Sequence, residues 1–90
     1  MACIDVDALA QYESDAKNGR ADALYNLGLA YSTGQGVRVD FIAAHKWFNL
    51  AAMRGIDEAK RWRAQISREM DSSQIAEAQR LAREWLSIGR

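Results

Sequence analysis

The segment that decides the fold is residues 23–52, with the sequence ALYNLGLAYSTGQGVRVDFIAAHKWFNLAA. Its first part repeats packing residues at the i, i+3, i+4, i+7 spacing of one helical face, at Leu24, Leu27, Gly28 and Tyr31. After a glycine-rich break, its second part repeats the same spacing at Ala44, Trp47, Phe48 and Ala51. No strand-like alternation of comparable length competes, so the segment is predicted to form two helices joined by a turn.

The pattern continues outward with a period of 36 residues. Gly19 and Ala23 recur as Gly55 and Ala59, with an acidic residue before each alanine. A period near 36 is typical of arrays of helical hairpins, which repeat every ~34 to 45 residues. The chain is therefore predicted to be a helical repeat protein.

Signals for helix ends flank these segments. Gly19 and Gly55 stand where a left-handed residue would end a helix. Asp40 offers a side-chain acceptor to the free amides at the start of the next helix. Asp71 and Gln74 have the spacing of a capping box before a final helix.

These observations predict an all-α fold in one domain, residues 1–90. The expected architecture is an α/α superhelix (solenoid) of about five antiparallel helices, roughly at 5–18, 20–32, 40–54, 56–69 and 72–87.

Taken together, ALYNLGLAY at 23–31, GQGV at 34–37, Asp40, and the Trp47–Gly55 region closely resemble a Sel1-like repeat, a relative of the tetratricopeptide-like α/α repeats. On this resemblance, residues 19–55 form one full repeat, residues 1–18 a half repeat, and residues 56–90 a degenerate C-terminal capping hairpin. In that last part, Arg63, Ala64 and Ser67 occupy the positions that correspond to Leu27, Gly28 and Tyr31 of the full repeat. The GQGV loop is absent there. The run at 74–82 resembles the terminal segment of bacterial Sel1-like proteins.

The resemblance implies that the first helix of each hairpin lines a concave surface that binds protein ligands. The predicted partner-binding residues are Asp22, Tyr25, Asn26, Leu29 and Ser32, continued 36 residues later by Glu58, Arg61, Gln65 and Arg68. Tyrosine, tryptophan and arginine are the types most often found as interface hot spots. Trp62 has two interpretations, a groove residue or part of the core of the cap, and the second is preferred.

Two functions follow from this prediction. The first is an adaptor that binds a protein or peptide on the concave face. The alternative is a structural module that forms homo-oligomers through an exposed first helix, whose apolar residues are Ile4, Val6, Leu9 and Tyr12.

Other classes of function lack a signal. Twelve basic and twelve acidic residues balance, so no overall field favours nucleic acid or an anionic membrane. One cysteine, Cys3, forms no internal disulfide and no zinc site, and the N-terminus lacks the features of a signal peptide. His45 is expected to be a partly exposed helix residue, and no catalytic residue, metal site or cofactor is predicted. A reducing, cytoplasmic setting is expected.

Overall fold

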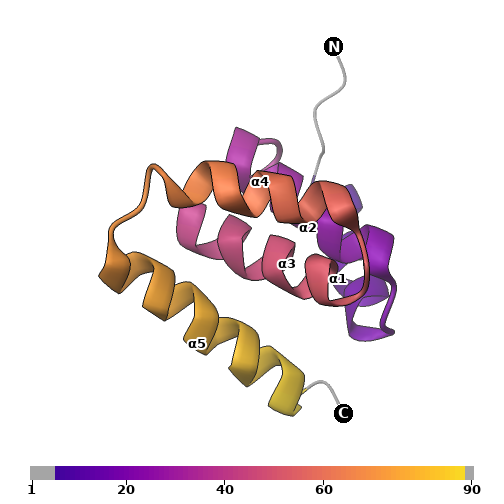
Figure 1. Cartoon of the computed structure of the whole chain (residues 1–90). Helices are drawn as coiled ribbons and strands as arrows, with labels where there is room; N and C mark the ends of the chain where they lie inside the picture. The colour runs from indigo at the N-terminus through magenta and orange to yellow at the C-terminus, as the bar shows by residue number, and fades with distance from the viewer. Residues whose placement is uncertain (1–5, 89–90) are drawn as a thin grey trace.

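The computed structural model describes residues 6–88, and these fold into five α-helices without a β-strand (Figure 1). The helices are α1 (Val6–Lys17), α2 (Ala21–Thr33), α3 (Phe41–Met53), α4 (Asp57–Ser67) and α5 (Ser72–Ile88). The predicted all-α fold is confirmed, with helix ends within two residues of those expected. Cys3, Ile4 and the expected helix start at residue 5 lie outside the described residues.

Helix α3 is the centre of the molecule. It packs against α2, α4 and α5, while α1 packs against α2. Figure 1 shows α4 and α5 on opposite sides of α3, with α5 running in roughly the same direction as α3. Because three helices cover it, α3 is buried over much of its circumference, and its hydrophobic residues are correspondingly numerous. This packing is consistent with the predicted superhelix of stacked hairpins.

The ends of the helices follow the sequence signals. Gly19 and Gly55 have φ angles of 85° and 95°, the left-handed conformation that glycine adopts without a steric penalty. The Asp40 carboxylate accepts a hydrogen bond of 3.1 Å from the amide of Ala43. At the start of α5 the amide of Gln74 donates to the Asp71 carboxylate at 2.8 Å, and the amide of Asp71 donates to the Gln74 side chain at 2.9 Å. The predicted cap and capping box are therefore confirmed.

The most extensive helix contact lies between α2 and α3. Gly28 faces the ring of Phe48, which is 0% exposed. A Cβ atom at position 28 would lie 2.5 Å from Cδ1 of that ring, far inside van der Waals contact. Glycine is therefore required here for space, and its low helix propensity, ~1 kcal/mol below that of alanine, is offset by the close packing that it permits.

The expectation for His45 was wrong. Its side chain is only 3% exposed, and its Nδ1 has no hydrogen-bond partner among the described residues. The reason is the central place of α3: neighbouring helices also cover the flank beside its main apolar stripe, where His45 lies. Burial lowers the pKa of His45, and the positive charge of Arg63 lowers it further, so the fold favours the neutral imidazole.

Candidate functional site

The residues predicted to bind a partner lie on two helices that both pack against α3, and we call them the α2–α4 surface. It comprises Asp22, Tyr25, Asn26, Leu29 and Ser32 of α2, Glu58, Arg61 and Gln65 of α4, and Arg68, the C-cap residue of α4. The three residues of α4, Arg68 and Asp22 are exposed, whereas the other four residues of α2 are half-buried. The α4 part thus offers long, exposed polar side chains, whereas the α2 part contributes the half-buried aromatic and aliphatic side chains of Tyr25 and Leu29.

An aromatic cluster joins the two helices of this surface. The indole N–H of Trp62 on α4 donates a hydrogen bond of 3.1 Å to the hydroxyl of Tyr25 on α2. Both rings pack on Phe48: Trp62 stacks on it at 6.1 Å between centroids with an interplanar angle of 10°, and Tyr25 is tilted by 55° at 5.9 Å. Both residues are half-buried and pack against the core. The packing of Trp62 therefore agrees with the preferred interpretation, in which it belongs to the core of the cap. The hydrogen bond between them holds the indole nitrogen of Trp62 beside the hydroxyl of Tyr25.

Not every predicted residue is equally available. Leu29 packs against the core, and the Ser32 hydroxyl donates to the Leu29 carbonyl at 3.0 Å, so both are engaged within α2. Asp22 forms an exposed ion pair of 3.6 Å with Arg20. In contrast, Arg61 and Arg68 are exposed and have no carboxylate partner within residues 6–88. The unpaired arginines of the α2–α4 surface are therefore on α4 and at its C-terminal end.

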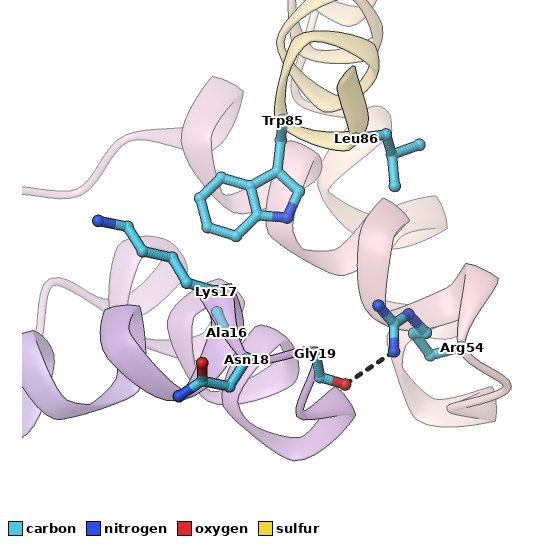
Figure 2. Close-up of a pocket in the computed structure, with 7 residues that line it drawn as sticks. All are labelled: Ala16, Lys17, Asn18, Gly19, Arg54, Trp85 and Leu86. Atoms are coloured by element: carbon cyan, nitrogen blue, oxygen red, sulfur yellow. Dashed lines mark hydrogen bonds between the residues drawn. The ribbon is translucent and has the colours of Figure 1, made fainter. Parts of the chain in front are cut away.

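A hollow of about 490 Å³, which the sequence did not predict, lies where the C-terminal ends of α1, α3 and α5 meet (Figure 2). We call it the C-terminal hollow. Its lining consists of Ala16, Lys17, Asn18, Gly19, Arg54, Trp85 and Leu86. Arg54, at the end of α3, donates a hydrogen bond of 2.7 Å to the carbonyl of Gly19, which ties α3 to the turn after α1. Because this arrangement depends on how helices distant in sequence pack, residue spacing alone carries no signal for it.

A second hollow of about 500 Å³ lies between the α2–α3 loop and the α4–α5 turn. Its walls include the side chains of Val37, Val39 and Phe41, and Val39 is 49% exposed. Tyr31 also lines it, and burial together with nearby Glu13 and Asp40 raises the pKa of this phenol. These walls carry charges of both signs, so the hollow has no defined electrostatic preference.

One lysine lies beside the aromatic residues that join α5 to α3. The ammonium of Lys46 is 4.0 Å from the ring centroid of Trp47 and 5.9 Å from that of Trp85, the range of cation–π interactions. The two indole rings meet edge to face at 4.9 Å and 76°. Burial lowers the pKa of Lys46, while Glu13, Asp40 and Glu84 oppose this shift by their negative charge. This cluster supports the α3–α5 contact.

Residues 6–88 contain neither a candidate metal site nor a candidate membrane-spanning helix. No group of three or more histidine, cysteine or acidic side chains lies close enough together there to hold a metal ion. None of the helices in this part of the chain is both long and apolar enough to cross a bilayer.

The fold and the 36-residue period define a helical-hairpin repeat protein. Within it, residues 21–56 match the family model of the Sel1 repeat. This segment, formed by α2, the glycine-containing loop and α3, therefore has the character of a Sel1 repeat, and the predicted resemblance is confirmed over these residues. No curated protein matches the chain. Sel1 repeats are generally modules of protein–protein interaction. The roles of the individual residues of the α2–α4 surface stay predictions.

Proposed function

We propose that this chain is an adaptor that binds a protein or peptide partner on the α2–α4 surface, and that it acts by binding rather than by catalysis. The observation that carries the proposal is the bond between Trp62 and Tyr25, which joins α2 and α4 on one face. Rigid aromatic side chains lose little conformational entropy on binding, which makes them good anchors. The interaction role of Sel1 repeats supports the same function.

The flanking side chains give the proposed surface its selectivity. Arg61 and Arg68 are free to bind carboxylates, because they have no acidic partner in the described part of the chain. Gln65 lies between them on α4 and supplies both a donor and an acceptor. The partner would therefore present acidic groups toward α4 and an apolar or aromatic group toward Tyr25.

The proposal is tested by affinity capture from a cell lysate, followed by mass spectrometry. The test variant is Arg61→Glu with Arg68→Glu, which reverses two exposed charges and removes no described contact. Tyr25→Ala is a poor choice, because it removes packing on Phe48, whereas Tyr25→Phe keeps the ring. Arg83→Glu on α5 is the matched control, since Arg83 is an equally exposed arginine.

Partners retained by the wild type and the α5 control, but lost by the α4 double variant, would support the proposal. The loss expected for two charge reversals at an interface is at least about tenfold in affinity. Retention of the same partners by all three proteins would contradict it. Circular dichroism of each variant separates loss of binding from loss of folding.

The alternative, homo-oligomer formation through the first helix, has less support. Leu9 and Tyr12 pack against the core and do not form a free apolar flank. Ile4 lies outside the described residues, and the side chain of Val6 is not described. Light scattering over a range of concentrations tests this alternative, because a constant monomer mass is incompatible with it. The proposed setting is the cytoplasm, for which the sequence remains the only argument.

A further inference from the structure

We infer that the C-terminal hollow is a second recognition site, which binds an acidic peptide segment of a partner protein through one carboxylate and an adjacent apolar side chain. This site goes beyond the α2–α4 surface, because its lining comes from α1, α5 and the end of α3. At about 490 Å³ it lies within the usual range of ligand sites, ~300–1,000 Å³. That volume accommodates a few residues of an extended chain.

The lining is positively charged. Lys17 and Arg54 belong to it, and no acidic side chain does. Neither cation forms an ion pair within residues 6–88. One N–H of Arg54 binds the Gly19 carbonyl, which leaves four of the five guanidinium donors for a ligand. The charge complement of this hollow is therefore an anion.

The partial negative charge at the C-termini of α1 and α3 does not occupy the positive charges of Lys17 and Arg54. The end of α1 is closed by the backbone, since the amide of Arg20 donates to the Asp15 carbonyl at 3.1 Å. The end of α3 is closed in the same way, by the amide of Ile56 and the Ala51 carbonyl at 3.2 Å. Because the backbone satisfies these carbonyls, the cations of the hollow remain available.

Trp85 supplies a directed donor beside the positive charge. Its indole N–H has no hydrogen-bond partner among the described residues. That nitrogen is also not fully buried, since the one fully buried side-chain polar atom without a partner in this part of the chain is Nδ1 of His45. In Figure 2 the indole extends from α5 toward the end of α1, with its nitrogen on the side facing Arg54. A carboxylate between them would accept from both groups.

The apolar half of the ligand would lie on α5. Leu86 lines the hollow beside Trp85 and is 36% exposed, a notable fraction for a large aliphatic side chain. Trp85 is held in place by its edge-to-face contact with Trp47, so the wall is preformed. Hydrogen-bond donors for a carboxylate, next to a rigid apolar wall, fit an acidic residue flanked by an aliphatic one. An inorganic anion would use only the first half of this site.

The test uses the full chain and two peptides that differ in one group, acetyl-SLELS-amide and acetyl-SLQLS-amide. Binding is followed by two-dimensional NMR of the amide and indole N–H resonances. We expect the glutamate peptide to shift the indole resonance of Trp85 and the amide of Gly19, with a dissociation constant on the order of 1 mM. The glutamine peptide should bind about tenfold more weakly, because it lacks the charge-assisted hydrogen bonds.

Two variants locate the site. Trp85→Phe keeps an aromatic ring against Trp47 but removes the N–H donor, and Lys17→Gln removes one charge without breaking a described contact. Each should weaken binding of the glutamate peptide several-fold, as read from the Gly19 amide. Lys60→Gln, an exposed lysine on α4, is the control and should leave binding unchanged. Equal binding of the two peptides, shifts confined to the α2–α4 surface, or no shift up to about 5 mM would overturn the inference.

Discussion

Replacing Gly28 with alanine tests the close contact between α2 and α3 at Phe48. The new Cβ would lie 2.5, 2.6 and 2.9 Å from Cδ1, Cε1 and Cγ of Phe48. Because Phe48 is 0% exposed and packs between Tyr25 and Trp62, its ring has no free space into which to move. Helix α2 and helix α3 must therefore separate, or the aromatic cluster must rearrange.

The expected magnitude follows from two opposing terms. Overpacking a core costs ~1–3 kcal/mol, and a contact this short belongs near ~3 kcal/mol. Alanine returns ~1 kcal/mol, because its helix propensity exceeds that of glycine. The net loss is about 2 kcal/mol, which corresponds to a decrease in Tm of about 8–16 °C for a domain of this size.

Urea denaturation followed by far-UV circular dichroism measures this loss. The control is the double variant Gly28→Ala with Phe48→Leu, compared with each single variant. A smaller side chain at position 48 makes room for the new methyl group, so the double variant should lose less stability than the sum of the singles, by about 1 kcal/mol. If Gly28→Ala were as stable as the wild type or more stable, the steric explanation for this glycine would be refuted.

Three further predictions concern single residues. Burial and the charge of Arg63 lower the pKa of His45 in the folded protein below its usual 6.5, so as the pH falls the unfolded chain takes up a proton at His45 before the folded one. The contribution of neutral His45 to stability should therefore be complete above about pH 7 and decrease below it, and His45→Leu should reduce the change of the urea midpoint between about pH 7 and 5. Asp40→Ala should cost about 1 kcal/mol in the same assay, because the amide of Ala43 loses its cap; an unchanged midpoint would exclude a stabilising cap. Gly55→Ala should cost ~1–2 kcal/mol although no atom lies within 4 Å of the new Cβ, since the φ of 95° strains any other residue; a neutral thermal melt would contradict this.

The helices and their ends could be predicted because their causes are local. The spacing of Leu24, Leu27 and Tyr31 defines a helical face by geometry alone. A cap such as Asp40 acts on an amide three residues away, so its partner is known from the sequence. A close approach of another helix at Gly28 was also predictable, since a glycine in the packing stripe of a helix suggests a close neighbour. Only the structure identifies that neighbour as Phe48.

Features that depend on three helices at once could not be predicted in this way. His45 lies off the main apolar stripe of α3, and its burial requires that neighbours cover more than one face of that helix. The bond from Trp62 to Tyr25 joins residues 37 positions apart, and the repeat pattern places them on related helices without fixing their contact. The C-terminal hollow depends on where Trp85 comes to lie beside Arg54. Tertiary packing decides each of these.

The two proposed recognition surfaces depend on different parts of one core. Trp47 and Phe48 are neighbours on α3, so their side chains point about 100° apart. Phe48 supports the Trp62 ring of the α2–α4 surface, while Trp47 supports the Trp85 wall of the hollow. A displacement of Phe48 by Gly28→Ala should therefore impair partner capture on the α2–α4 surface and leave peptide binding in the hollow unchanged at temperatures where the variant is folded. Equal impairment at both would mean that α3 shifts as a whole, and that the two surfaces are coupled through the helix that they share.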